Sequence, residues 1–378
     1  METLIQNFGR DELVRLKLRA LYERRGFRRV KTGKFEEYAL YVENKNFLET
    51  DSIITFMDLD GKLLALKPDV TLSIIKNIPK KAMPAAQKVY YIDEVYRLSP
   101  ESREYKVHNQ IGVELIGDSD GFSNLEIIDL ALESLWTINQ RFALDISHLG
   151  FISGLLSELK LSHRLESALL ENIHAKNSWD IAQLLEQAEA PEEKVRQVLL
   201  LATLHGGFSK SLAQARELVC NDEMRAAYDE LAQMEKLLKS CGANGNVNLD
   251  FSVVNDLDYY NGLIFRGYVE GVPTLVLTGG RYDNLMKRMG KHNGAIGFGI
   301  SLDELGTYLK SGRQYNFDIL ITYSATCDFA ALLAVVRERF AEKQVRLERE
   351  GSDLAAAGLT FRQHLRYRDG KLEEVASC

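Results

Sequence analysis

Two adjacent tyrosines, Tyr259 and Tyr260, follow an aspartate in the segment NDLDYYNGLIF (residues 255–265). Successive side chains of a β-strand point to opposite faces, so one tyrosine could join the core while the other lines a pocket. Three further segments are polar where a core strand should be apolar: LKPDVT (66–71), VYRLSPESREYKVHNQIGVE (95–114) and TGGRYDNL (278–285). The question is whether these side chains form a pocket that carries out chemistry or one that only binds a ligand.

Each of these segments also has a structural explanation. Asp69 and Thr71 could cap the helix predicted to follow them. Glu114, between two apolar residues, could lie on a solvated strand face, and the tyrosines could be core residues. Gly279-Gly280 could be a bend or a bulge. No single segment therefore identifies a site.

Local patterns predict the first elements that would position these residues. Apolar residues near helical spacing predict an amphipathic helix over residues 11–26. Asp60-Gly61 between apolar-rich runs predicts a β-hairpin with this pair at its turn, because both turn residues must accept positive φ. Residues 88–98 and 107–117 are predicted to form a longer antiparallel pair around a polar loop.

The second half of the chain is predicted to be helical first and strand-rich later. Ser123 and Glu126 have capping-box spacing, which predicts a helix that starts there. From residue 151 to residue 243 the pattern is helical. Strands are predicted again in VNLDFSVV, LIFRGYVEG and TLVLTGG. Residues 317–378 are predicted to form a last unit of strand, helix and strand, similar to the start of a small α/β domain.

Composition narrows the class of protein. Hydrophobic residues make up 46% and charged residues 27%, which is typical of a globular chain, and the net charge of −7 argues against a broad nucleic-acid-binding face. The four cysteines have no metal-ligand spacing, so neither a zinc site nor a disulfide framework is indicated. No apolar run approaches the roughly 20 residues that span a bilayer. We expect a cytoplasmic protein without metal.

Taken in order, the polar segments resemble the catalytic core of histidyl-tRNA synthetase, a class II aminoacyl-tRNA synthetase. MDLDGKLLALKPDVT is similar to the segment that places the amino-group ligands, and YRLSPESREYKVHNQIGVELIG is similar to motif 2 with its loop. LDYYNGLIF and GGRYDNL resemble the two histidine-specific signatures, and GAIGFGISLDEL resembles motif 3. The similarity covers residues 11–310.

The resemblance implies an α+β fold: a class II synthetase-like antiparallel sheet flanked by helices, with a helical insertion and a short C-terminal α/β unit. The core would span residues 1–312, interrupted by the insertion at 151–243. Residues 313–378 would be a truncated anticodon-binding-like unit, since that domain is longer in the family. Its role is open between partner docking, dimer support and a vestige.

The resemblance also implies which residues bind histidine: Asp69, Thr71, Arg97, Gln110, Glu114, Tyr259, Tyr260 and Tyr282. Asp69, Thr71 and Gln110 would hold the α-amino group, because acidic and carbonyl acceptors suit an ammonium. Glu114 and Tyr260 would hydrogen-bond the imidazole. The other two tyrosines would close the pocket, and Arg97 would take part of the charge pairing with the ligand.

Three positions depart from the family pattern, all on the ATP side. Asn255 stands where the family has an arginine that serves adenylation, and Glu304 stands where motif 3 has an arginine for the terminal phosphates. Ser99 replaces the acid of the family's Arg-x-Glu in motif 2. Two unit charges 4 Å apart interact by roughly 4 kcal/mol at an effective dielectric near 20. An acid in place of an arginine beside the phosphates therefore turns an attraction of this size into repulsion. Histidine activation is therefore predicted to be lost, with no catalytic residues retained.

A synthetase-like core that keeps the amino-acid pocket but loses activation resembles the regulatory subunits of ATP phosphoribosyltransferase, a family of histidyl-tRNA synthetase paralogues. The resemblance implies a non-catalytic chain that activates the short-form catalytic subunit and conveys feedback inhibition by L-histidine. A homodimer within a hetero-oligomer is expected, without a cofactor, tRNA or a membrane as partner. The alternatives are an active histidyl-tRNA synthetase with degenerate motifs and a binding module for another small molecule.

Overall fold

The computed structural model describes residues 10–44, 53–79, 85–99, 102–117, 121–243, 245–254, 259–308, 315–352 and 359–375. Contacts divide the chain into two units. The larger unit is Val14–Leu309, and the smaller one combines Met1–Leu13 with Lys310–Cys378.

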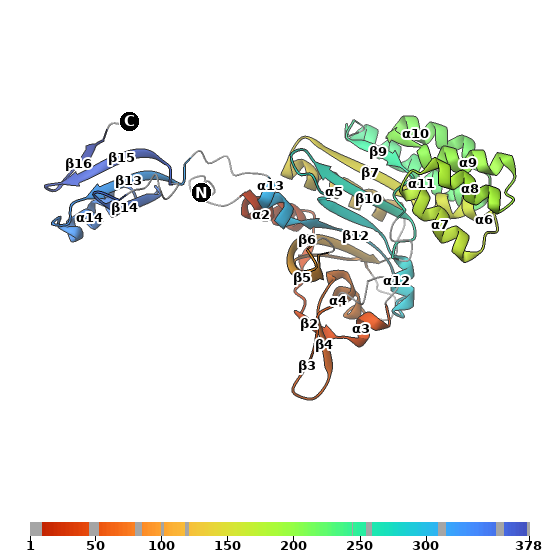
Figure 1. Cartoon of the computed structure of the whole chain (residues 1–378), viewed down its shortest axis with the longest axis horizontal. Coiled ribbons are helices and arrows are strands. Elements are labelled where there is room, and N and C mark those ends of the chain that lie inside the picture. Colours follow the sequence, from red (N-terminus) through yellow and green to blue (C-terminus); the bar gives the residue numbers. More distant parts are fainter. Residues whose placement is uncertain are drawn as a thin grey trace. The chain divides into compact units, whose positions relative to one another are not determined.

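A mixed sheet forms the centre of the larger unit (Figure 1). Within the described residues it has nine strands, which run in the order β1 (Arg28–Arg29), β5 (Gln87–Leu98), β6 (Tyr105–Gly117), β12 (Gly294–Ser301), β11 (Leu277–Arg281), β10 (Leu263–Val269), β7 (Phe142–His148), β9 (Val247–Asp250) and β8 (His205–Gly207). The β1/β5 and β7/β9 pairs are parallel and the others antiparallel. The predicted α+β class, with an antiparallel centre to the sheet, is confirmed.

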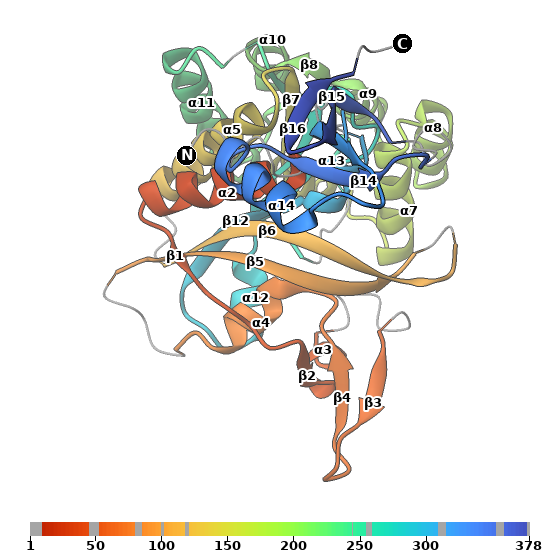
Figure 2. The same cartoon turned by 90° about the vertical axis from the view of Figure 1, so that its left-hand side faces the viewer.

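The two faces of this sheet carry different side chains because strand residues alternate. On β6, Ile111, Val113 and Leu115 belong to the core shared with helices α2 (Arg10–Arg24) and α5 (Gly121–Ile138). Gly112 and Glu114 face the other side, which helices α4 (Val70–Lys76) and α12 (Asp283–Arg288) cover. Figure 2 shows α2 and α5 on one side of β5 and β6, and α4 and α12 on the other.

A small three-stranded sheet precedes α4. Its strands are β2 (Phe35–Glu37), β4 (Leu63–Leu66) and β3 (Thr55–Met57), in that order, with helix α3 (Ala39–Val42) between β2 and β3 in sequence. The predicted β3–β4 hairpin is confirmed, but its turn is longer than two residues. Gly61 has a φ of +79° while Asp60 does not have a positive φ. Asp58 closes the turn, because its carboxylate accepts from the backbone N–H groups of Asp60 (2.9 Å) and Lys62 (2.8 Å).

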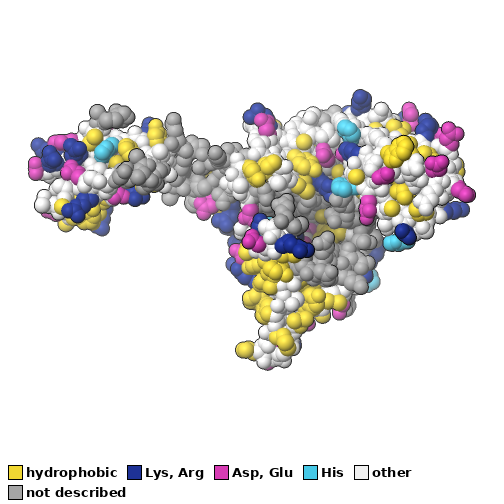
Figure 3. All heavy atoms as spheres, viewed as in Figure 1, with side chains coloured by type: hydrophobic (Ala, Val, Ile, Leu, Met, Phe, Trp, Pro, Cys, Tyr) yellow, Lys and Arg dark blue, Asp and Glu magenta, His cyan; other side chains and the backbone are white. Residues whose placement is uncertain are grey.

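Large apolar side chains are exposed on this small sheet and its hairpin (Figure 3): Phe35, Phe56, Met57, Leu59 and Leu63. The Phe35 and Phe56 rings pack edge to face with centroids 5.2 Å apart. Contiguous exposed apolar surface of this kind marks protein contact sites more often than free surface.

Helices follow one another from the end of β7 to the start of β9, with β8 as a short strand among them. They are α6 (Leu149–Ser157), α7 (His163–His174), α8 (Ser178–Gln187), α9 (Glu192–Thr203), α10 (Phe208–Ala215), the 3-10 turn η3 (Arg216–Leu218) and α11 (Asp222–Ser240). On α11 the buried residues recur at helical spacing, as Met224, Ala227, Leu231, Met234 and Leu238. None of the helices within the described ranges is long and apolar enough to cross a membrane.

Helix α5 does not start where the capping box predicted. It begins at Gly121, so Ser123 lies inside the helix and is not its N-cap. The next residue, Asn124, is 2% exposed and donates from Nδ2 to Oε2 of Glu230 on α11 (3.0 Å). Tertiary packing against α11 therefore takes precedence over the local capping signal at this helix end.

The C-terminal unit contains the predicted strand, helix and strand as β13 (Phe317–Tyr323), α14 (Phe329–Arg339) and β14 (Val345–Arg349). Two further strands, β15 (Phe361–Arg368) and β16 (Lys371–Glu374), were not predicted. The sheet order is β14-β13-β15-β16, and β13 runs parallel to both of its neighbours. The unit is therefore a small α/β sheet with one antiparallel edge.

Candidate ligand-binding site

A buried carboxylate lies at the centre of the site. Glu114 is 2% exposed, in the half of β6 that is buried on both faces, so the solvated-strand explanation is wrong. Thr71 of α4 donates its hydroxyl to Oε1 of Glu114 (2.8 Å), and the hydroxyl of Tyr282 donates to Oε2. Within the described residues no lysine, arginine or histidine pairs with this carboxylate. Glu114 is thus held by the hydroxyl groups of Thr71 and Tyr282.

The environment of Glu114 favours its neutral form. Burial, with a smaller contribution from the nearby Asp69 carboxylate, raises the pKa of Glu114 to about 8 against the two hydroxyl hydrogen bonds. A buried carboxyl of this kind is stabilised in its charged form when a cation or an N–H donor reaches it. The site is therefore suited to a ligand that brings such a donor.

Glycine on the neighbouring strand makes room for this carboxylate. Gly297 of β12 lies opposite Glu114 in the sheet. A Cβ atom at Gly297 would lie 1.9 Å from Oε2 of Glu114 and 2.4 Å from the Val113 carbonyl oxygen. Such distances are well below van der Waals contact, so the Glu114 position requires glycine here.

Three tyrosine rings pack together beside Glu114. The Tyr259 and Tyr260 rings have centroids 4.6 Å apart, and those of Tyr259 and Tyr282 are 5.9 Å apart. The prediction that Tyr259 and Tyr260 point to opposite faces of a strand is wrong, because β10 begins only at Leu263. Burial, together with the charges of Asp69 and Glu114, holds the pKa of Tyr259 well above its usual value. Burial likewise raises the pKa of Tyr282, so the Tyr259 and Tyr282 phenols are neutral hydrogen-bonding groups.

Asp69 caps α4, as its structural explanation proposed. Its Oδ1 accepts from the backbone N–H of Leu72 (2.8 Å). Burial raises the pKa of Asp69, while this hydrogen bond and the charge of Arg97 act in the opposite direction. Thr71 does not cap the helix, since its hydroxyl binds Glu114. Helix α4 therefore delivers one acidic and one hydroxyl side chain to the same site.

Arg97 and Gln110 lie farther from the carboxylate. Arg97 is exposed on β5, and its Nε donates to the Pro68 carbonyl (2.7 Å), next to Asp69. Gln110 shares a face of β6 with Glu114, but strand geometry separates their Cα atoms by about 13 Å. The structure thus brings Thr71, Glu114 and Tyr282 into direct contact, with the Tyr259 and Tyr260 rings beside them. Gln110 lies four residues before Glu114 on the same face of β6 and is not part of this group.

The three positions that depart from the synthetase pattern are described unequally. Asn255 lies outside the described residues, and the side chain of Glu304 in α13 (Leu302–Tyr308) is likewise not described. Ser99 closes the loop after β5, because its N–H donates to the Glu104 carbonyl and its own carbonyl accepts from Arg103, both at 2.8 Å. Next to Glu304, Asp303 accepts two hydrogen bonds of 2.8 Å from Asn109 of β6.

Comparison with known proteins identifies the family. A family model for histidyl-tRNA synthetase matches residues 2–305. A curated ATP phosphoribosyltransferase regulatory subunit of Thermoanaerobacter sp. (strain X514) is 31% identical over 315 residues, which cover 81% of this chain and 82% of that protein. The chain belongs to the ATP phosphoribosyltransferase regulatory subunit family.

Solved structures show the same fold as this member of the regulatory subunit family. An ATP phosphoribosyltransferase regulatory subunit/histidyl-tRNA synthetase from Bacillus halodurans has a TM-score of 0.77 and 23% identity, with 94% of this chain and 93% of that chain covered. A chain of the ATP phosphoribosyl transferase complex from Thermotoga maritima has a TM-score of 0.62 and 20% identity, with 77% and 97% covered. The predicted class II synthetase-like fold is thereby confirmed.

In this family member, two groups near the site were missed by sequence reasoning. Tyr91 of β5 is buried on the Glu114 face, and a Cβ at Gly112 would lie 2.5 Å from its hydroxyl oxygen. Lys67 is fully buried and pairs with Asp93 (2.5 Å), while it donates to Thr32 (2.6 Å). Strand alternation could have placed Tyr91 and Asp93 near the site, because residues two apart on β5 point to the same face of the sheet, here the face of Glu114.

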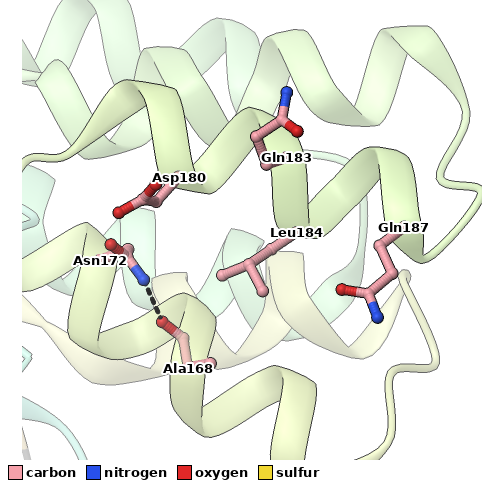
Figure 4. Close-up of a pocket in the computed structure, with 6 residues that line it drawn as sticks. All are labelled: Ala168, Asn172, Asp180, Gln183, Leu184 and Gln187. Atoms are coloured by element: carbon pink, nitrogen blue, oxygen red, sulfur yellow. Dashed lines mark hydrogen bonds between the residues drawn. The ribbon is translucent and has the colours of Figure 1, made fainter.

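A separate hollow lies between α7 and α8, away from the sheet (Figure 4). It has a volume of about 340 Å³ and is lined by Ala168, Asn172, Asp180, Gln183, Leu184 and Gln187. Asn172 donates to the Ala168 carbonyl (2.8 Å), and Asp180 accepts from Asn177 (2.6 Å), so both are engaged locally. No cluster of histidine, cysteine and acidic side chains in the described segments could hold a metal ion.

The protonation of Glu114 predicts a pH-dependent stability. Its pKa is about 8 in the folded protein against an ordinary value of 4.5, so between these values the folded state retains a proton that the unfolded chain has released. The stabilisation is fully present below pH 4.5 and is lost as the pH rises through 8. In this window the free energy of unfolding should fall by about 1.4 kcal/mol per pH unit from this group. Urea denaturation of wild type and Glu114→Gln at pH 5 and pH 8 measures the difference, and an equal pH dependence in both proteins would contradict a buried neutral carboxyl.

The Gly297 contact predicts that one methyl group disrupts the site. Gly297→Ala should expel the Glu114 carboxylate or separate β12 from β6, with a loss of about 1–3 kcal/mol in unfolding free energy. Gly207→Ala is the matched control, because nothing lies within 4 Å of its Cβ position and its φ is −50°. Urea denaturation of the two variants measures the contrast; equal stabilities would show that Glu114 does not need this space.

Proposed function

We propose that this chain binds L-histidine in the Glu114 site and thereby regulates a short-form ATP phosphoribosyltransferase catalytic subunit. In this proposal the chain raises the rate of its partner and conveys feedback inhibition by histidine in histidine biosynthesis. The observation that carries the proposal is the buried Glu114 carboxyl, held by Thr71 and Tyr282 in a chain of this family.

Glu114 supports recognition of the imidazole ring. An imidazole presents an N–H donor in its neutral form and two donors in its cationic form, and a buried carboxylate accepts either. No cation of the described residues competes for this carboxylate. A ligand without an N–H at this position would leave a buried acceptor unpaired, which gives strong discrimination among amino acids.

The tyrosines support the placement of the ring. Tyr259, Tyr260 and Tyr282 form a continuous aromatic cluster beside Glu114. The Tyr260 hydroxyl would bond the second ring nitrogen, while Tyr259 and Tyr282 would close the pocket around the ring. Phenols suit this role because they offer flat apolar faces with a hydrogen-bonding group at one end.

The α-amino and carboxylate groups of histidine would lie toward α4 and the outer part of β6. Asp69 uses Oδ1 to cap α4, and a carboxylate has further lone pairs with which it could accept from an ammonium. Gln110 and Thr71 would add to this amino-group site. Arg97, exposed beside Asp69, would pair with the ligand carboxylate.

The residue types on the ATP side support binding without activation. Adenylation requires positive charge around the triphosphate and its transition state. The sequence has a neutral residue at Asn255, an acid at Glu304 and no acid at Ser99, where the synthetase pattern has arginine, arginine and glutamate. The chain would therefore hold histidine as a signal and not as a substrate.

Regulation would work through linkage between histidine and the assembly. Histidine would bind one conformation of the complex more tightly and shift the population toward a less active state. The Thermotoga maritima chain of similar fold comes from an ATP phosphoribosyl transferase complex, which supports a catalytic subunit as partner. A homodimer of this chain within the hetero-oligomer is part of the proposal.

The direct test of this function is the rate of a short-form catalytic subunit from the same organism, measured with and without this chain. We expect the chain to raise the rate and added histidine to suppress the increase, because the Glu114 site lies on this chain and the catalytic subunit assayed alone lacks it. Bovine serum albumin at equal concentration controls for non-specific stabilisation. An unchanged rate with this chain present would remove the regulatory role.

Two substitutions test the pocket itself. Glu114→Gln and Tyr260→Phe should each weaken histidine binding about 10-fold to 100-fold, because the first replaces a charged acceptor by a neutral amide and the second removes a hydroxyl that would bond the ring. Tyr268→Phe and Glu104→Gln are matched controls at exposed positions, on β10 and in the loop before β6. Calorimetry gives the affinities, and unchanged values in both pocket variants would refute the assignment.

A further inference from the structure

A histidine, a glutamate and an asparagine lie together where the helical segment, the helices α6 to α11 between β7 and β9, joins the sheet. His148 ends β7 and precedes α6, Glu230 lies on α11, and Asn124 lies on α5. Nε2 of His148 is 3.4 Å from Oε2 of Glu230, and Nδ2 of Asn124 donates to the same oxygen (3.0 Å). Oε2 of Glu230 on α11 thus contacts both the end of β7 and helix α5.

This contact is buried and its geometry is constrained. His148 is 6% exposed and Asn124 is 2% exposed. In the described structure Nδ1 of His148 and Oδ1 of Asn124 have no hydrogen-bond partner, so Glu230 supplies the polar contact that each side chain does make. Gly150 allows the ring to lie there, since a Cβ on it would be 3.2 Å from Cε1 of His148. Buried polar groups with few partners make the remaining contact important.

Electrostatics reinforce the contact. The hydrogen bond with His148 is the largest influence on Glu230 and lowers the pKa of its carboxyl, against the opposing effect of burial. The charges of His148 and Arg281 act in the same direction. The Glu230 anion is therefore favoured by the His148 ring that it contacts and by the charge of Arg281, the residue before Tyr282.

The same residues adjoin both tyrosine segments of the candidate site. His148 pairs with Leu263 at the start of β10, and the next backbone N–H, of Leu149, donates to the Gly262 carbonyl (2.9 Å). Gly262 lies against Arg281, where a Cβ would be 3.2 Å from Cδ of that arginine. The Asn261 N–H donates to the Arg281 carbonyl (2.9 Å). Tyr260 and Tyr282 each lie within two residues of this group of contacts.

We propose that Glu230 and His148 are positioning residues, through which the helical segment holds the backbone that carries Tyr259, Tyr260 and Tyr282. Neither residue is proposed to touch the ligand. The inference rests on the proposed function, because the tyrosines matter only as parts of a histidine site. It makes α11 a contributor to ligand affinity, although α11 lends no side chain to the pocket.

The test compares Glu230→Gln, His148→Gln and the double variant in the full chain. Without histidine, hydrogen exchange should be faster by about threefold to tenfold at Leu149 and in peptides covering residues 259–268, in each single variant. Histidine affinity, measured by calorimetry, should fall by a similar factor. The double variant should be no worse than the poorer single variant, because both substitutions break one contact.

Glu223→Gln is the matched control on α11, where the carboxylate accepts from Ser153 of α6 (2.5 Å). This control should leave exchange at residues 259–268 and histidine affinity unchanged, even if it lowers the melting temperature. Additive effects in the double variant, or unchanged exchange or affinity in Glu230→Gln, would overturn the proposal. If the wild type binds no histidine, the proposed function fails. The exchange measurement would still test whether Glu230 and His148 hold the backbone of residues 259–268.

Discussion

The structure of the site depends on one constraint, a carboxyl buried in the central part of the sheet. Glu114 lies on a strand that is covered on both faces, and such a group persists only where donors and space are provided. Helix α4 supplies Thr71, and Tyr282 follows the end of β11. Gly297 on the neighbouring strand has no side chain, which leaves space for the carboxyl. Burying the Glu114 carboxyl therefore depends on α4, on the residue after β11 and on β12 together.

This arrangement separates recognition from chemistry. Glu114, Thr71 and Tyr282 are buried and in contact, and the half-buried Tyr259 and Tyr260 rings pack beside them. The positions where the synthetase pattern has its adenylation charges, Asn255, Ser99 and Glu304, differ from the residues that bond the Glu114 carboxyl. In the proposed function, a chain of the regulatory subunit family keeps a histidine site on a synthetase-like fold while its partner carries out the reaction. The contact of Glu230 with His148 is the proposed link from the helices between β7 and β9 to this site.

Much of the fold was predictable because it follows from local patterns and ordered motifs. The β3–β4 hairpin and the long β5–β6 pair were predicted from turn residues and alternation. Sequence alone could not show that Glu114 is buried, since burial depends on α4 packing over the sheet. It also placed Tyr259 and Tyr260 on a strand, although β10 starts at Leu263 and both rings join one cluster. The contact of His148 with Glu230 spans 82 residues and had no local signal.

The central claim is that the chain binds histidine and does not activate it. The measurement that tests this most directly is histidine-dependent ATP–pyrophosphate exchange by the purified chain, at histidine concentrations shown by calorimetry to saturate it. The account predicts saturable binding of one histidine per chain, with no pyrophosphate exchange above the rate measured in the absence of the chain. Exchange that requires histidine would contradict it and identify an active synthetase, and an absence of histidine binding would remove the Glu114 site as its basis.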